Sequence, residues 1–343
     1  MRQLASILKI DEIKAIEGAD AIELVKIKGW QCVVKKGEFK SGDLCVYFEV
    51  DSFLPIDSRY EFLRRTSYRN NKYMGEGFRV KTITMRGEIS QGLALPLPLF
   101  PHLNPMIGLD VTESLGVRKW EIPETLGNMG IAIGEKPYGI PTTDEMRLQS
   151  MPEFLEEFRG VPYYITTKLD GTSCSIYCYD GKVGVCGRNL EYKEDVETSA
   201  MWAWVHKNGL ADKLFALSEN IAIQGEFCGE GIQKNRLKLM EPELFVFDIV
   251  LLHDGGRIEK LGLDGLRDYC ERLGLEMVAV EEVGHSFNYS LDEMLEKARG
   301  KYPSGLDKEG IVVRTQKRER SEALNHKMSF KVINNDFLKK EDG

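Results

Sequence analysis

The chain has 343 residues, 42% of them hydrophobic, which is enough for two domains that each bury a core. Its 46 basic and 54 acidic residues give a net charge of −8, which argues against a protein that coats nucleic acid nonspecifically. The N-terminus lacks the features of signal and transit peptides, and no apolar run approaches a membrane span. We therefore expect a folded intracellular protein, cytoplasmic or, in a eukaryote, nuclear, without membrane contacts.

The N-terminal third of the chain has the pattern of short strands separated by turns. Strands are predicted at residues 22–27, 30–35, 44–50 and 78–84, with a last one near Leu93, and glycine-containing turns separate them. Short β-branched runs at this spacing predict a small closed barrel, for which the OB-fold, a common oligonucleotide-binding barrel, is the natural candidate. Four prolines between residues 96 and 105 end this region.

A basic and aromatic stretch lies within this N-terminal region, between residues 59 and 86. Its cations could hold phosphates while its interleaved tyrosine and phenylalanine rings stack on bases. The alternative is a solvated loop with ordinary core aromatics. The candidate nucleic-acid-binding residues are Arg64, Arg65, Arg69, Lys72, Arg79, Lys81 and Arg86.

The rest of the chain predicts a connecting segment and a second domain. Glycine and proline are frequent up to about residue 152, so we expect domain 1–118, a connecting segment 119–152 and domain 153–343. The second domain mixes strands and helices without a GxGxxG or Walker loop, which predicts an α+β fold. Its expected helices are 195–207, 210–217, 263–273 and 291–299, and its expected strands are 163–167, 175–179, 182–186, 221–227, 244–252, 277–283 and 310–315.

Lys168 is the most informative residue of this second domain. It ends a β-prone run and precedes Asp170-Gly171, which predicts a lysine held on an antiparallel hairpin. A lysine amine can act as a nucleophile when it loses its proton, which nearby cations, a metal ion and desolvation promote. The alternative is a surface hairpin with a solvated lysine.

Five further residues follow Lys168 in an order that suits nucleotide transfer. Arg188, in Gly-Arg-Asn, offers donors for ribose or phosphate oxygens, and Glu226 could accept hydrogen bonds from ribose hydroxyls. Either Phe245 or Phe247 could stack on a purine, Glu309 could hold a hydrated Mg²⁺, and Lys331 could contact the α-phosphate. Each residue taken singly also has a structural or solvated interpretation, but together they favour a nucleotide site.

The motif order KLDG, GRN, GEF, FVFDI, EGIVVR and SFK resembles the nucleotidyltransferase motifs of the covalent ligase and capping-enzyme superfamily. Together with the N-terminal barrel, the chain is similar over nearly its whole length to ATP-dependent RNA ligases of the type known from Deinococcus and Naegleria. The resemblance implies an OB-like β-barrel followed by a nucleotidyltransferase domain of antiparallel sheets with flanking helices. It also implies an enzyme that seals 3′-hydroxyl and 5′-phosphate ends at RNA nicks.

Carried over to this chain, the resemblance implies roles for particular residues. Lys168 would form a lysyl-AMP, Glu309 and Lys331 would complete the catalytic set, and Glu309 and Asp170 would hold the metal ion. The implied ATP- and AMP-binding residues are Lys168, Asp170, Gly171, Arg188, Glu226, Phe247, Lys331 and Lys327. The last motif often has two lysines separated by one residue, but Ser329 stands at the first of those places here, which leaves the role of Lys327 open.

The implied cofactors are ATP and Mg²⁺ or Mn²⁺, and the implied partner is RNA, or an RNA/DNA hybrid, bound by a monomer. Alternatives within the same chemistry are a DNA ligase and a capping guanylyltransferase, which normally place the OB domain after the lysine domain. A noncatalytic OB-type RNA-binding protein is an alternative from another class, because residues 18–24 resemble the start of tRNA-binding OB modules.

Overall fold

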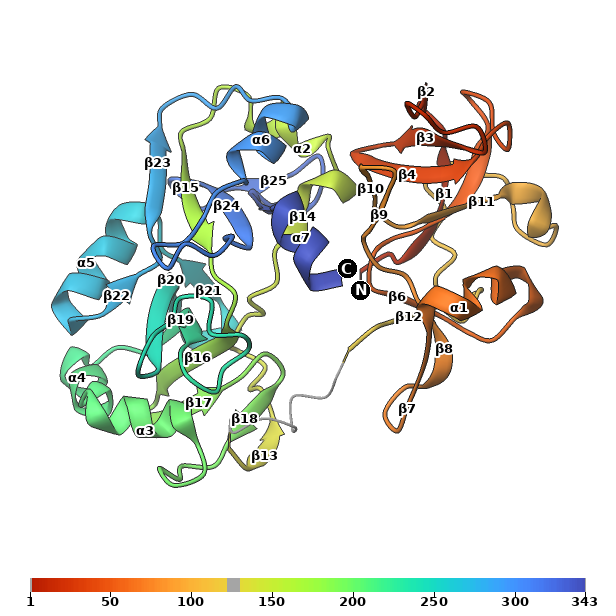
Figure 1. Cartoon of the computed structure of the whole chain (residues 1–343). Helices are drawn as coiled ribbons and strands as arrows, with labels where there is room; N and C mark the ends of the chain where they lie inside the picture. The colour runs from red at the N-terminus through yellow and green to blue at the C-terminus, as the bar shows by residue number, and fades with distance from the viewer. Residues whose placement is uncertain (1, 122–129, 343) are drawn as a thin grey trace. The chain divides into compact units, whose positions relative to one another are not determined.

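Two sets of strands that share no sheet define two units in the computed structural model, which describes residues 2–121 and 130–342. Within those residues the first unit comprises the chain up to residue 121, Gln149–Pro152 and residues 335–342. The second unit comprises residues 130–148 and Glu153–Asn334. Figure 1 shows the elements of each unit along the chain.

The first unit is built from short antiparallel strands in four sheets, ordered β1-β5-β11, β2-β3-β4, β12-β6-β8-β7 and β10-β9. Strands β3 and β4 match their predicted ranges. The bounds are β1 Ala5–Lys9, β2 Glu12–Ala15, β3 Ile22–Ile27, β4 Trp30–Lys35, β5 Leu44–Phe48, β6 Ser52–Leu54, β7 Tyr68–Asn71, β8 Gly75–Arg79, β9 Ile83–Met85, β10 Glu88–Ser90, β11 Leu93–Pro96 and β12 Arg118–Lys119. Its helices are α1 Arg64–Ser67 and α7 Asn335–Asp342, with 3₁₀ turns η1 Ser58–Leu63 and η2 Leu97–Leu99.

These sheets differ in detail from the expected single closed sheet. Asp51 has a φ of 69°, and at this bend the chain leaves the sheet of β5 and enters the sheet of β6. The predicted strand 78–84 is likewise two strands, because β8 ends at Arg79 and β9 begins at Ile83. The buried side chains of the described residues form two clusters in this unit, one that contains Phe48 and Phe78 and one that contains Trp30 and Tyr47.

The second unit contains a large, mainly antiparallel sheet covered on one face by helices. Its strand order is β13-β18-β17-β16-β19-β20-β21, with β22 also paired to β20. The bounds are β13 Ala132–Glu135, β16 Thr172–Tyr179, β17 Lys182–Cys186, β18 Leu190–Tyr192, β19 Ile221–Cys228, β20 Glu243–Leu252, β21 Ile258–Lys260 and β22 Glu276–Met277. The covering helices are α3 Ala200–Lys207, α4 Leu210–Leu217 and α5 Leu263–Leu273, and η5 spans Asp254–Gly256.

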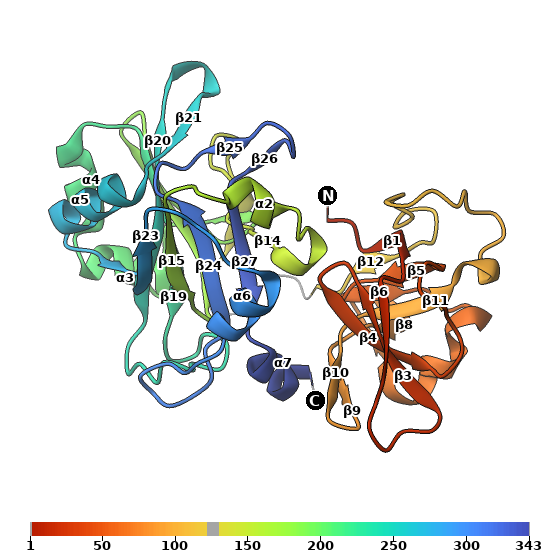
Figure 2. The same cartoon turned by 90° about the horizontal axis from the view of Figure 1, so that it is seen from above.

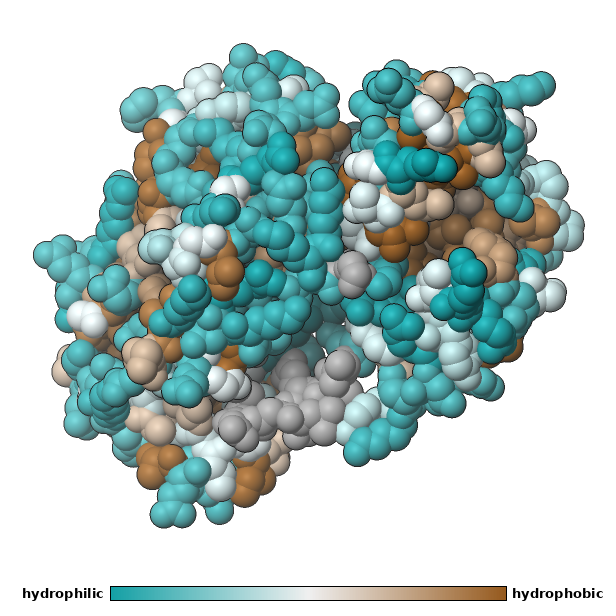
Figure 3. Space-filling model, viewed as in Figure 1, coloured by the Kyte–Doolittle hydropathy of each residue, from teal (hydrophilic) through white to brown (hydrophobic). Residues whose placement is uncertain are grey.

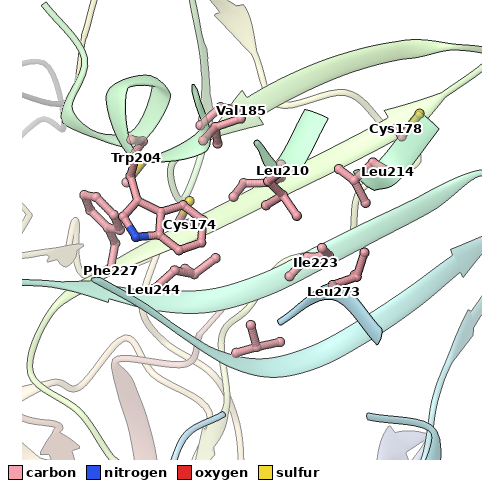
Figure 4. Close-up of a cluster of buried hydrophobic side chains, with 14 of the residues drawn as sticks. Cys174, Cys178, Val185, Trp204, Leu210, Leu214, Ile223, Phe227, Leu244 and Leu273 are labelled. Atoms are coloured by element: carbon pink, nitrogen blue, oxygen red, sulfur yellow. The ribbon is translucent and has the colours of Figure 1, made fainter. Parts of the chain in front are cut away.

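The core between this sheet and its helices holds the strands that carry the site. Figure 4 shows Trp204 beside Phe227 and Leu244, and Ile223 near Leu273. Helix α3 begins at Ala200 rather than at the predicted residue 195, because the Ser199 hydroxyl accepts a hydrogen bond from the Trp202 backbone N–H and caps the helix there. Burial of each such large apolar side chain contributes about 1.5–3 kcal/mol.

A second sheet of this unit has the order β14-β27-β24-β15-β23. Phe330 on β27 packs against Phe158, with ring centroids 5.0 Å apart. Since successive side chains of a strand point to opposite faces, Lys331 lies on the other face of β27. Figure 2 shows α2 and α6 beside β27 and β24. The bounds are β14 Met146–Arg147, β15 Tyr163–Lys168, β23 Val280–Gly284, β24 Gly310–Thr315, β25 Arg320–Ser321, β26 His326–Lys327, β27 Ser329–Ile333, α2 Phe154–Phe158 and α6 Leu291–Lys297.

The predicted connecting segment 119–152 is more regular than expected. It contributes to β12 in the first unit and contains β13 and β14 in the second, where the backbone of these strands pairs with β18 and β27. Residues 122–129 of this segment lie outside the described part of the chain. Residues 335–342, expected in the second domain, form helix α7, which belongs to the first unit.

The surface of the second unit shows how its apolar residues are distributed. In Figure 3 hydrophilic residues cover most of its visible face, and the hydrophobic ones form small groups. None of the helices in the described ranges is long and apolar enough to cross a membrane.

Candidate active site

Lys168 stands where the chain crosses from one sheet of the second unit to the other. Strand β15, which ends at Lys168, pairs with β23 and β24, whereas β16 pairs with β17 and β19. The predicted hairpin between β15 and β16 is therefore wrong. Gly171 makes the crossing possible, because a Cβ there would lie 2.5 Å from the Cys228 Sγ and 2.6 Å from the Phe227 carbonyl oxygen.

The amine of Lys168 is held by a carboxylate from the neighbouring strand. Its Nζ donates to Glu309 Oε2 at 2.7 Å, and the two side chains are 21% and 19% exposed. The sheet register brings the two residues near each other, since Lys168 pairs with Gly310 and Glu309 comes directly before it. A partly buried ion pair of this kind is screened by water less than a surface pair.

Two more carboxylates act on this amine through their charge. Glu226, from β19 of the larger sheet, accepts a hydrogen bond from the Gly171 backbone N–H at 3.2 Å. Asp170 pairs with the nearly buried Arg236 guanidinium at 2.9 Å. The structure thus brings together the predicted residues Lys168, Asp170, Gly171, Glu226 and Glu309.

The pKa values of these groups report the excess of negative charge. Burial alone would lower the pKa of the Lys168 amine, but the Glu309, Glu226 and Asp170 carboxylates outweigh it and raise that pKa above the ordinary lysine value. Burial raises the pKa of the Glu226 carboxyl to about 7, against the opposing charge of Lys168. In the absence of a ligand, Lys168 is therefore protonated at neutral pH and is not yet a nucleophile.

Lys331 and Phe247 approach the same space from two strands. Thr166, Val312 and Lys331 are register partners across β15, β24 and β27, so Lys331 lies on the face of this sheet that also carries Lys168, two residues beyond Thr166. The Phe247 ring, on β20, is half-buried and lies 5.6 Å from the Arg314 guanidinium. Arg314, on β24, also donates to the Thr166 hydroxyl at 3.0 Å within the smaller sheet, so its contact with Phe247 links the two sheets.

Arg188 and Lys327 are held by an acidic segment that the sequence analysis did not single out. Arg188 pairs with the Asp144 carboxylate at 2.6 Å. Lys327 donates to the Asp144 carbonyl oxygen at 2.7 Å and pairs with Glu145 at 3.0 Å. Glu145 also accepts from the Ser329 hydroxyl, and the Lys327, Arg314 and Arg318 charges lower its pKa to about 2 despite its burial.

Most of the predicted nucleic-acid-binding residues of the first unit lie on or between α1, β7 and β8, whereas Lys81 and Arg86 come after β8. Arg64 pairs with Glu61 at 2.6 Å and lies 4.8 Å from the Tyr68 ring, and Arg79 pairs with Asp51 at 3.3 Å. The exposed members of the predicted nucleic-acid-binding set are Arg64, Arg65, Lys72 and Arg86, and the half-buried ones are Arg69, Arg79 and Lys81.

The site suits a hydrated divalent cation better than a protein-caged one. Within the described residues, no group of three or more His, Cys, Asp or Glu side chains is arranged to hold a metal ion. Mg²⁺ normally keeps several waters and takes one or two carboxylates together with substrate phosphates. Glu309 and Asp170 supply carboxylates of that kind beside the Lys168 amine.

Four residues of this region were missed at the level of sequence. Arg236 and Tyr302 lie in irregular segments without a recognisable spacing, and their contacts depend on the fold. Asp144 and Glu145 sit in the segment expected to be a connection. Their signal was the adjacent acids in a stretch otherwise rich in glycine and proline.

Comparison with known proteins agrees with this geometry. An OB-fold domain family matches residues 4–97, and the RNA ligase family matches residues 161–333. The solved structure of Naegleria gruberi RNA ligase with pyrophosphate is 37% identical, with a TM-score of 0.89 over 99% of each chain. No curated protein sequence was found to match.

Two variant structures of the same Naegleria enzyme are also similar. A glutamate-to-alanine variant with AMP and Mn has a TM-score of 0.90 and 36% identity over 100% of both chains. A lysine-to-alanine variant with ATP and Mn has a TM-score of 0.89 and 36% identity over 99% of this chain and 100% of that one.

The fold and the lysine–carboxylate site thus define a ligase of the nucleotidyltransferase type. The chain belongs to the RNA ligase family. The predicted fold class, an N-terminal OB-fold followed by a ligase domain in an α+β chain, is confirmed.

The raised pKa of Glu226 predicts a pH dependence of stability. The folded-state pKa of about 7 lies above the ordinary value of 4.5, so the contribution of Glu226 is fully present below pH 4.5 and is lost as the pH rises through 7. Relative to Glu226→Gln, the wild type should lose up to about 3 kcal/mol of unfolding free energy across this range. Denaturant titrations from acid to neutral pH measure the difference.

Glu197→Gln, which removes an exposed carboxylate of the same unit, is the matched control and should retain the pH dependence of the wild type. The prediction is contradicted if the difference in unfolding free energy between wild type and Glu226→Gln stays constant over this pH range. It is also contradicted if the wild type gains stability relative to Glu226→Gln as the pH rises.

Proposed function

We propose that this RNA ligase stores AMP on Lys168 and uses it to join a 3′-hydroxyl to a 5′-phosphate of RNA. The observation that supports the proposal most is the position of the Lys168 amine, 2.7 Å from Glu309 at a strand end, with two further carboxylates beside it. The expected cofactors are ATP and Mg²⁺ or Mn²⁺. Similar structures that contain ATP or AMP with Mn support this expectation.

In the first step the deprotonated Nζ of Lys168 attacks the α-phosphorus of ATP. The new nitrogen–phosphorus bond forms as the bond from the α-phosphorus to the bridging oxygen breaks, and pyrophosphate leaves. Lys331, on the same sheet face, would offset the charge that grows on the α-phosphate oxygens. Covalent storage of AMP divides one difficult condensation into easier displacements.

Two transfers to RNA complete the reaction. A 5′-phosphate oxygen of the RNA attacks the phosphorus of the lysyl-AMP, which frees the amine and leaves AMP on the 5′ end. The 3′-hydroxyl of the adjoining strand then attacks the RNA 5′-phosphorus, loses its proton and expels AMP. The two RNA ends are then joined by a phosphodiester. AMP is a better leaving group than the one that an unactivated 5′-phosphate would have to release.

The remaining predicted residues would hold the nucleotide. Glu226 would accept hydrogen bonds from the ribose, and the half-buried Phe247 ring would stack on adenine. Arg188 and Lys327, held by Asp144 and Glu145, would meet ribose or phosphate oxygens.

Glu309 and Asp170 would hold the divalent cation. The cation would supply positive charge beside the phosphate oxygens, and a Glu309 carboxylate that held it would release the Lys168 amine. Loss of that carboxylate contact removes a main cause of the raised Lys168 pKa.

The first unit would bind the RNA. Its exposed cations lie among aromatic rings, an arrangement that suits phosphates and unpaired bases. We propose repair of nicked RNA, including nicks in an RNA/DNA hybrid, by a monomer.

Lys168→Ala tests the covalent intermediate. After incubation with α-labelled ATP and Mg²⁺, the wild type should carry an acid-labile label through denaturing electrophoresis, and Lys168→Ala should carry none. Lys182→Ala, which removes an exposed lysine of β17, should be labelled like the wild type. Label retained by Lys168→Ala would refute the assignment of the nucleophile, and an unlabelled wild type would favour a noncatalytic RNA-binding protein.

A double variant of Arg65 and Lys72 to alanine tests RNA binding by the first unit. It should self-adenylylate normally but seal nicked RNA more slowly, and its RNA affinity should fall less steeply with salt because about two phosphate contacts are lost. The matched control changes Lys36 and Lys40, exposed lysines elsewhere in the same unit. Equal RNA affinity and equal salt dependence in both double variants would remove this surface from the RNA site.

A further inference from the structure

Tyr302 lies under the site in the segment between α6 and β24. Its side chain is 4% exposed and packs in a small apolar cluster with Leu169, Cys228 and Val278. Its backbone is fixed as well, because the Tyr302 N–H donates to the Leu306 carbonyl oxygen at 2.8 Å. Both the ring and the main chain of Tyr302 are therefore held in place.

The Tyr302 hydroxyl makes three hydrogen bonds, all to the backbone of proposed site residues. It donates to the Lys168 carbonyl oxygen at 2.8 Å. It accepts from the Asp170 N–H at 3.1 Å and from the Glu309 N–H at 3.0 Å. One oxygen atom thus joins the end of β15, the crossing to β16 and the start of β24.

These three bonds use the full capacity of a tyrosine hydroxyl, which has one donor and two acceptor positions. The hydroxyl has no bond left for a substrate, so it cannot serve as an acid, a base or a nucleotide contact without breaking one of them. The hydroxyl can therefore influence the reaction only by holding Lys168, Asp170 and Glu309 in position. Burial and the neighbouring Glu309 and Asp170 carboxylates raise the Tyr302 pKa, which keeps the donor proton in place at neutral pH.

We propose that Tyr302 is a positioning residue for lysine adenylylation, whose hydroxyl sets the spacing between the Lys168 nucleophile and its partner Glu309. The inference rests on the proposed role of Lys168. The register of β15 and β24 brings the two strands together, but Glu309 precedes its strand and Asp170 follows its own, so sheet pairing alone does not fix them. The hydroxyl supplies the missing constraint.

Tyr302→Phe removes this constraint and keeps the ring in the apolar cluster. We expect the single-turnover rate of Lys168 adenylylation to fall on the order of 10- to 100-fold, because small displacements of a reacting group cost that much. ATP affinity should change less than about 3-fold, since the hydroxyl has no capacity for the nucleotide. A loss in the rate with ATP affinity kept separates a positioning role from a general loss of structure.

Tyr177→Phe is the matched control. It removes another buried hydroxyl of the same unit, one that donates to Glu191 at 2.5 Å, five residues or about 17 Å along β16 from the crossing. Its adenylylation rate should equal that of the wild type. Rates are compared per folded molecule, with the folded fraction of each variant taken from its unfolding curve.

A Tyr302→Phe enzyme with the wild-type adenylylation rate would overturn the inference. A loss that disappears once the rate is expressed per folded molecule would overturn it as well. If Tyr302→Phe does not fold, 3-fluorotyrosine at position 302 keeps the ring and hydroxyl but weakens the oxygen as an acceptor, and it should slow adenylylation without loss of ATP affinity. Label on Lys168→Ala would instead refute the assignment of Lys168 as the nucleophile. Failure of the proposed function can therefore be told apart from failure of the inference about Tyr302.

Discussion

The ion pair between Lys168 and Glu309 is the interaction on which the site depends. It joins a strand end in the smaller sheet of the second unit to the start of the neighbouring strand, at the point where the chain leaves for the larger sheet. The surrounding carboxylates make the site strongly negative, which stabilises the protonated amine, and in our proposal they would also hold the divalent cation. The same arrangement of charge therefore keeps the amine protonated before ATP binds.

The two-sheet architecture explains why the site can gather residues from so many parts of the chain. Each sheet buries one face under helices, and strand ends of both sheets lie near the crossing. Side chains from both sheets, such as Lys168 and Glu226, therefore lie close together. Gly171 is required there because the Cys228 Sγ and a backbone carbonyl fill the volume of a Cβ. Arg314 adds a second link between the sheets through the Phe247 ring.

Much of this was predictable from sequence because strong local patterns coincide with tertiary roles. Strands β3 and β4 and helices α4 and α5 have their predicted bounds, since their apolar periodicity and flanking glycines agree with their burial. The lysine motif, Glu226 of β19 and Glu309 directly before β24 were also singled out, because the short motifs of this family stay in a fixed order. Their meeting in space follows from the β15–β24 and β16–β19 registers.

What was missed depends on partners that no local pattern specifies. The hairpin expected after Lys168 was wrong because an Asp-Gly turn fits both a hairpin and a crossing between sheets, and only the strand pairing separates them. The acids Asp144 and Glu145 were hidden in a segment whose glycines and prolines suggested a connection. Tyr302 is part of no recognisable motif. Only the folded structure shows that its hydroxyl forms hydrogen bonds with the backbone of Lys168, Asp170 and Glu309.

The protonation state of Lys168 tests the central claim most directly. Lysines labelled with ¹³C at the ε position can be titrated by NMR, with the Lys168 signal identified by its loss in Lys168→Ala. The Lys168 signal should remain that of the protonated amine at pH values above 10.5, where ordinary lysines have lost their proton, and it should titrate at lower pH in Glu309→Gln. A Lys168 that titrates with the other lysines, unchanged by Glu309→Gln, would contradict the account.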